Sequence, residues 1–194
     1  MVKEVNGRTT EYPINDIFLK RYSPRAFSGE AISKEELMTL FEAARFAPSG
    51  SNVQPWRFIY AMRESPEFHD FLMFLTESNR EWCAKAGALV VTISKTTRDN
   101  GVLSKTNSFD AGLTVENLLL QATELGLYAH PMAGIVPEVI KEKLNIPDEY
   151  KIEMMIAIGK PGKVSELSER NRIREKPSDR KPLSEIVFEG KFSV

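Results

Sequence analysis

Residues 47–58 have the sequence APSGSNVQPWRF, in which turn-forming residues separate a helical pattern from an extended one. On the N-terminal side, Ser33 and Glu36 form a capping-box pair, and apolar residues recur at helical spacing from Leu37 to Ala44. On the C-terminal side, Arg57–Met62 has the composition of a strand. The stretch therefore predicts a helix joined to a strand by a loop of small residues, amides and prolines.

Further elements are predicted on both sides of this unit. The expected helices are a short one at residues 14–20, one that starts at Ser65-Pro66, and two in the second half of the chain, at 110–125 and 136–144. Extended segments are expected at residues 88–93, 127–132 and 154–158. Because helices and strands alternate irregularly, we expect an α+β fold in which helices flank a central mixed or antiparallel sheet. A chain of 194 residues fits one domain, residues 1–194.

Two segments predict contacts with a second subunit. Residues 110–125 are apolar on nearly all sides, so this helix must be buried, and a subunit interface is a natural place for it. Residues 163–180 carry charges of both signs without a core pattern, which favours a solvated linker over a binding patch. The apolar residues 186–188 follow, and they predict a C-terminal arm that docks on a partner subunit.

The composition excludes several classes of protein. A net charge of -1 argues against a dedicated nucleic-acid binder. One cysteine, Cys83, excludes an internal disulfide framework, and two histidines, His69 and His130, make a histidine-based metal site improbable, so we expect no metal. No apolar run approaches the ~20 residues that span a bilayer. The polar start of the chain has no signal-peptide pattern, so a cytoplasmic protein is expected.

The familiar catalytic and nucleotide-binding motifs are missing. There is no Gly-x-Gly-x-x-Gly after a strand, no Gly-x-x-x-x-Gly-Lys-Ser/Thr loop and no Gly-x-Ser-x-Gly elbow. The acidic residues are scattered, with no spacing that marks a catalytic pair. If the protein is an enzyme, a bound cofactor is therefore expected to supply the reactivity, with no catalytic side chain of its own.

Two motifs carry candidate chemistry. The sequence RYSPRAF, residues 21–27, places two guanidinium groups and a hydroxyl within five positions, a set suited to phosphate. Cations that decorate a helix C-terminus are the alternative interpretation. The loop at residues 47–58 offers backbone and side-chain donors to the edge of a flat heteroaromatic ring. A polar turn beside a core tryptophan, Trp56, is the alternative there.

Together, these two motifs resemble those of the nitroreductase family, Arg-x-Ser-x-Arg-x-Phe followed by Pro-Ser-x-x-Asn-x-Gln-Pro-Trp. Three later segments extend the likeness over nearly the whole chain. Residues 110–127 are similar to the family's long central helix, residues 131–147 to its flavin-contacting strand and loop, and residues 180–183 to its C-terminal phosphate-binding element.

The resemblance implies a nitroreductase-like fold, a bound FMN and a homodimer with flavin sites at the subunit interface. Arg21, Ser23 and Arg25 are then expected at the phosphate, the ribityl chain and the pyrimidine edge, and Arg180 at the phosphate. Residues 48–52 would reach the flavin from the other subunit, residues 131–134 would line the ring, and Asn79 would contact the pyrimidine edge. The expected cofactor-binding residues are Arg21, Tyr22, Ser23, Arg25, Pro48, Ser49, Gly50, Asn52, Gln54, Asn79, Pro131, Met132, Ala133, Gly134, Arg180 and Lys181.

The implied reaction is hydride transfer from NADH or NADPH to an electron-poor acceptor, such as a nitroaromatic or a quinone, in two half-reactions at one site. Flavin N5 would carry the chemistry. Two alternatives stay open. One is a specialised flavin enzyme of the same fold: a dehalogenase, an azoline dehydrogenase or a flavin-cleaving enzyme. The other is a flavin-binding dimer without turnover. A flavin-free α+β domain is the remaining possibility.

Three residues have ambiguous roles. His130 adjoins the expected flavin loop, but a structural role is favoured over contact with substrate. Phe109 could lie over the flavin, although a core aromatic is the favoured interpretation. Cys83 has no neighbouring base in the sequence and is expected to be inert. The segment between Asn79 and Asp110 is short, which predicts a more open site than in larger family members.

Overall fold

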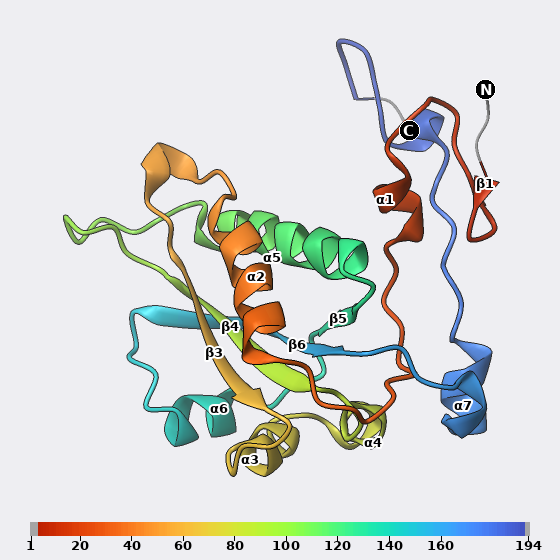
Figure 1. Ribbon diagram of the computed structural model, residues 1–194. Helices are drawn as coiled ribbons and strands as arrows, with labels where there is room; N and C mark the ends of the chain where they lie inside the picture. Colours follow the sequence, from red (N-terminus) through yellow and green to blue (C-terminus); the bar gives the residue numbers. More distant parts are fainter. Residues whose placement is uncertain (1–3, 193–194) are drawn as a thin grey trace.

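The computed structural model describes residues 4–192 and has a four-stranded antiparallel sheet at its centre (Figure 1). The strand order is β3-β4-β6-β5. The strands are β3 Trp56–Met62, β4 Ala88–Lys95, β5 Tyr128–Met132 and β6 Tyr150–Gly159. Helices cover both faces of this sheet, so the predicted α+β fold is confirmed.

Strand β4 lies between β3 and β6, and its residues from Ala88 to Ser94 are all buried. Its β-branched apolar sequence predicts this burial. Val91 pairs with Ile59 of β3 on one side and with Met155 of β6 on the other. The β4–β6 register shifts between Thr92 and Ile93. Beyond this irregularity β6 continues to pair with β4, so it starts four residues before the predicted strand.

Helices α2 (Lys34–Arg45) and α5 (Asn107–Glu124) pack together on one face of the sheet. The capping box is confirmed: the Ser33 hydroxyl accepts from the Glu36 amide at 3.0 Å, and the Glu36 carboxylate accepts from the Ser33 amide at 2.7 Å. Helix α5 buries much of its apolar surface here, and Gly126, with φ +72°, follows its end. The predicted position of this helix is confirmed.

The other face carries α3 (Phe68–Met73), α4 (Glu77–Cys83) and α6 (Pro137–Lys143). The helix predicted after Ser65-Pro66 is present, but it begins only at Phe68 and ends at Met73, and a second helix, α4, follows it. The break has a tertiary cause. Leu75 forms a bridge with Ile135, and the Thr76 amide donates to the Gly134 carbonyl at 3.0 Å, so the chain cannot continue as a helix.

Segments from the two ends of the chain lie side by side (Figure 1). The N-terminal part forms β1 Glu4–Val5, β2 Arg8–Thr9 and α1 Asp16–Lys20. The C-terminal part contains α7 Glu169–Ile173, and short 3-10 turns occur at Gly50–Asn52, Val164–Glu166 and Leu183–Glu185.

The interpretation of residues 163–180 as a solvated linker is wrong at two positions. Asn171 is 4% exposed, and the side chain of Glu175 is 1% exposed. Both are buried because they hydrogen-bond to other elements, which a charge pattern cannot reveal. The apolar residues of the arm are open by contrast, with Ile186 57% and Val187 64% exposed. Within residues 4–192, none of the helices has the length and apolar character needed to cross a membrane.

Candidate active site

The RYSPRAF segment runs in extended form from the end of α1 to the edge of the sheet. Arg21 is the C-cap residue of α1, and Phe27 forms a bridge with Pro161, just after β6. The amide of Gly162 donates to the Ala26 carbonyl at 2.6 Å. A Cβ on Gly162 would lie 2.3 Å from the carbonyl carbon of Phe27, so only glycine permits this approach. The backbone of the motif is thereby fixed against β6.

Three guanidinium groups gather at the N-terminal end of this motif. Arg8 is 6% exposed and donates to the carbonyl of Ser178 through Nε (3.0 Å) and to those of Leu19 and Arg21 through Nη1 (3.1 and 2.6 Å). Burial lowers the pKa of Arg8, and the charges of Arg180 and Arg21 lower it further. Arg8, Arg21 and Arg180 are thus within electrostatic range of one another. They form what we call the arginine cluster.

The arginine cluster fits an anion such as a phosphate. Arg21 has a side chain only 14% exposed, and its ion pair with the half-exposed Glu116 is loose, at 3.8 Å. Arg180 donates to the carbonyls of Ser178 and Asp179 in its own segment. Burial is the main cause of the lowered pKa of Arg8, and the charges of Arg180 and Arg21 add to it, so the local charge favours an anion.

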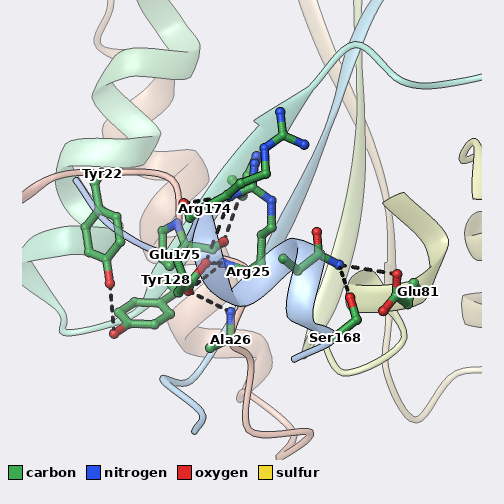
Figure 2. Close-up of polar contacts among 11 residues, drawn as sticks. Tyr22, Arg25, Ala26, Glu81, Tyr128, Ser168, Arg174 and Glu175 are labelled. Atoms are coloured by element: carbon green, nitrogen blue, oxygen red, sulfur yellow. Dashed lines mark hydrogen bonds and ion pairs between the residues drawn. The ribbon is translucent and has the colours of Figure 1, made fainter. Parts of the chain in front are cut away.

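The other end of the motif is held by aromatic contacts and by a carboxylate. The Tyr22 hydroxyl donates to that of Tyr128 on β5 at 3.3 Å, and burial together with this bond raises the pKa of Tyr22 (Figure 2). The guanidinium of Arg25 lies 5.9 Å from the centroid of the Trp82 ring. The backbone amides of Arg25 and Ala26 donate to Glu175.

Asn79 and Gly134 lie in direct contact. The Gly134 carbonyl accepts from Asn79 Nδ2 at 3.1 Å and from Thr76 Oγ1 at 3.2 Å. A Cβ on Gly134 would lie 2.4 Å from Asn79 Nδ2, so the Asn79 side chain packs directly against the Gly134 backbone. In the neighbouring positions Ala133 is exposed, whereas Met132 is buried with its Sδ 3.6 Å from Cys83 Sγ. The side chain of Met132 is therefore not available to a ligand.

The loop at residues 48–54 is built by side-chain to backbone bonds. The Gly50 amide lies 3.4 Å from both carboxylate oxygens of Asp110, and the Ser49 hydroxyl accepts from the Gln54 amide at 3.0 Å. Asn52 and Gln54 have positive φ, at 56° and 49°. The loop is thus preformed at the start of α5.

The structure does not bring this loop to the RYSPRAF motif within one chain. The loop contacts α5 through Asp110, whereas Arg21 faces Glu116, six positions later on the same helix. Residues six positions apart project from different sides of a helix. The loop and the motif also lie well apart in Figure 1. The last predicted residue, Lys181, pairs with Glu185 on the exposed arm at 3.4 Å.

Three ambiguous residues are resolved. His130 is buried, its Nδ1 lies 2.9 Å from the Pro24 carbonyl oxygen, and its ring packs on Trp82 at 4.5 Å, which supports the structural role. Burial lowers the pKa of His130 to about 4. The charge of Arg25 lowers it further, whereas the hydrogen bond to the Pro24 carbonyl oxygen acts in the opposite direction. Cys83 is buried, and burial raises its pKa, which supports the prediction that it is inert. The core prediction for Phe109 is wrong, since this residue is 69% exposed.

Arg8 and Glu175 were not predicted as site residues from the sequence. Arg8 lies in a polar segment before the first predicted helix, and Glu175 lies in a run of mixed charges. Nothing in either segment marks these residues, because their partners are the backbone of the motif, more than ten residues away in each case.

Comparisons with known proteins agree with this geometry. The model of the nitroreductase family matches residues 18–70 and 70–160. A crystal structure described as an oxidoreductase containing FMN is 44% identical, with a TM-score of 0.96 over 98% of each chain. A Bacillus subtilis protein named "Putative NAD(P)H nitroreductase MhqN" is 26% identical over 87% of this chain and 94% of its own. An iodotyrosine deiodinase of Thermotoga neapolitana is 25% identical over 81% and 94%. The chain therefore belongs to the nitroreductase family.

Proposed function

We propose that this chain is an FMN-dependent oxidoreductase, built as a single domain over residues 1–194, that passes hydride from NAD(P)H to an electron-poor acceptor. The proposed acceptors are nitroaromatics or quinones, and both half-reactions use one site. The arginine cluster carries the proposal, because it holds three cations within electrostatic range of one another, a charge distribution suited to an anion. Two relatives support it: a 44% identical structure is described as containing FMN, and MhqN is named for NAD(P)H.

Each part of the proposed site has a binding role. Arg21 and Arg180 would hold the phosphate, since guanidinium groups donate two parallel bonds to phosphate oxygens. Ser23 would donate to the ribityl chain, and Arg25 would face the pyrimidine edge. Asn79, held by Gly134, would present its amide at the same edge. The backbone at residues 131–134 would line the ring.

Bound FMN would supply the redox chemistry, since its N5 accepts a hydride and later gives it up. The protein then needs no nucleophile or general base of its own. Its residues bind the cofactor, orient it and place a fixed cation near the ring, where charge develops during reduction. Arg25 is suited to that task, because it is largely buried and lies over Trp82.

The active form is proposed to be a homodimer with the site between subunits. Within one chain, the loop at residues 48–54 is remote from the arginine cluster, so Pro48, Ser49, Gly50 and Asn52 would serve the partner's flavin. Exposed apolar side chains support this arrangement: Phe46 is 71%, Leu103 71% and Phe109 69% exposed. A dimer would also give the open C-terminal arm a surface to cover.

Reductive dehalogenation is the second candidate, favoured by the relative named iodotyrosine deiodinase. A steady-state comparison separates the two. The FMN-loaded protein would receive NADH or NADPH with a nitroaromatic, a benzoquinone or an iodinated phenol. The proposal expects rapid turnover of the first two acceptors and little iodide release. Iodide release without nitro or quinone reduction would establish the second candidate. Absence of turnover with all three, in protein that holds FMN, would leave a flavin-binding dimer.

A further inference from the structure

Glu175 is a buried carboxylate aimed at the backbone of the RYSPRAF motif. Its Oε1 accepts from the amides of Arg25 (2.8 Å) and Ala26 (2.9 Å), and its Oε2 lies 2.9 Å from the Arg25 amide nitrogen (Figure 2). The side chain is 1% exposed. Burial of a carboxylate is costly unless it is paired and hydrogen-bonded, so this contact must hold both segments in place.

Helix α7, which ends two residues before Glu175, is itself anchored. Asn171 of α7 is buried, and its Nδ2 lies 3.3 Å from a carboxylate oxygen of Glu81 on α4 and 3.2 Å from the Ser168 hydroxyl (Figure 2). Arg174, the C-cap residue of α7, contributes its carbonyl oxygen 3.4 Å from Nη1 of Arg25. Glu175 therefore reaches the motif from a fixed support.

Glu175 also sets the charge around Arg25. Its Oε2 lies 4.0 Å from Nη1 of Arg25, whose side chain is 18% exposed. Burial lowers the pKa of Arg25, the charge of Arg174 lowers it further, and Glu175 opposes both effects. At this distance and burial, one negative charge changes the local potential appreciably.

We propose that Glu175 is a positioning residue of the cofactor site: it fixes the backbone of Arg25 and Ala26 and offsets the Arg25 charge beside the flavin. This rests on the FMN site proposed above. Two separable effects follow. The hydrogen bonds to the backbone keep Arg25 in its binding position. The negative charge of Glu175 reduces the electrostatic stabilisation that Arg25 gives to the reduced flavin, and so lowers the flavin midpoint potential.

Two substitutions separate these effects. In Glu175→Gln, the amide oxygen can still accept from both backbone amides, while the negative charge and the second contact to the Arg25 amide are lost. In Glu175→Ala, the charge and the backbone bonds are both lost. Glu166→Gln is the matched control, because Glu166 lines the same groove as Arg25 but pairs with Lys85 at 2.6 Å and is 43% exposed. Thermal melts of all variants would check folding.

The measurements are FMN affinity, by fluorescence titration, and the flavin midpoint potential, by anaerobic titration with reference dyes. Glu175→Gln should bind FMN nearly as wild type does but with a higher midpoint potential. Glu175→Ala should bind FMN at least about tenfold more weakly, as expected when hydrogen bonds to a charged group are lost. Glu166→Gln should match wild type in both.

The contrary results point to different failures. If wild-type protein cannot be loaded with FMN, the proposed function fails and the role of Glu175 fails with it. If wild type holds FMN but Glu175→Gln has the wild-type potential, the charge role of Glu175 is overturned alone. Unchanged FMN affinity in folded Glu175→Ala would overturn the backbone role.

Discussion

The buried guanidinium of Arg8 donates to the carbonyl oxygen of Arg21, with 2.6 Å between Nη1 and O. Its Nε donates to the carbonyl of Ser178 on the C-terminal segment. One side chain thus joins strand β2, the end of α1 and the arm. Arg21 and Arg180 thus both lie within electrostatic range of Arg8, although they are far apart in the sequence.

Replacement of Arg8 by lysine should weaken both folding and FMN binding. The ammonium group of lysine cannot reproduce the geometry with which the Arg8 guanidinium donates to three carbonyl oxygens. We therefore expect the free energy of unfolding to fall by about 2–4 kcal/mol and FMN to bind at least about tenfold more weakly. Urea unfolding and FMN fluorescence titration would measure the two effects. Lys34→Gln, at an exposed position at the start of α2, is the control and should change neither. Wild-type FMN affinity in Arg8→Lys would contradict the role of Arg8.

Gly134→Ala should damage the link to Asn79. The added Cβ would lie 2.4 Å from Asn79 Nδ2 and 2.9 Å from Thr76 Oγ1, so both side chains must move. We expect a loss of about 1–3 kcal/mol in stability, from overpacking, together with weaker FMN binding. The same change at Gly112 of α5, where a Cβ meets no atom within 4 Å, should be neutral or stabilising. If both substitutions changed stability and FMN binding equally, the close contact between Gly134 and Asn79 would not be the cause.

Acid should destabilise the protein through His130. Burial depresses the pKa of His130 in the folded state to about 4, below the ordinary value of 6.5, so the unfolded chain binds the proton more readily. Stability is therefore complete above pH 6.5 and falls as the pH drops toward 4, by about 3 kcal/mol in total. His130→Gln should flatten this part of the stability profile, whereas His69→Gln, at an exposed position, should leave it in place. An unchanged profile in His130→Gln would exclude His130 as the cause.

A charge at Phe109 should break the proposed dimer. Phe109 is 69% exposed at the start of α5, near the loop that would serve the partner's flavin. Phe109→Glu should shift the protein toward monomer in sedimentation experiments and release FMN as the dimer dissociates. Met73→Glu, on α3 at the other face of the sheet and 45% exposed, is the matched control. A Phe109→Glu protein that stays dimeric would place the interface elsewhere.

Local patterns predicted much of the fold. The capping box at Ser33 and Glu36, the apolar run of β4 and the helix before Gly126 are all determined by neighbours in the sequence, and all are confirmed. The break between α3 and α4 was not predictable, because it depends on Leu75 and Thr76 pairing with residues near 134. Phe109 was misassigned because an apolar residue at a helix start has the same pattern whether it is buried in a core or exposed at the surface.

The candidate site was predictable only in part, and through resemblance. RYSPRAF and residues 48–54 are recognisable because their residue types carry the chemistry. Asn79 and Gly134 came from the resemblance, and the structure joins them. The contacts that position the motif, from Arg8 and Glu175, are long-range bonds to backbone atoms and leave no pattern along the chain.

An anaerobic absorption spectrum of the purified, FMN-loaded protein tests the central claim most directly. NADH and then NADPH would be added while the visible flavin bands are followed. The proposed function predicts flavin bands in stoichiometric amount that bleach with at least one nucleotide and return when a quinone is added. A protein that stays colourless after incubation with FMN, or whose flavin bands persist with both nucleotides, would contradict it.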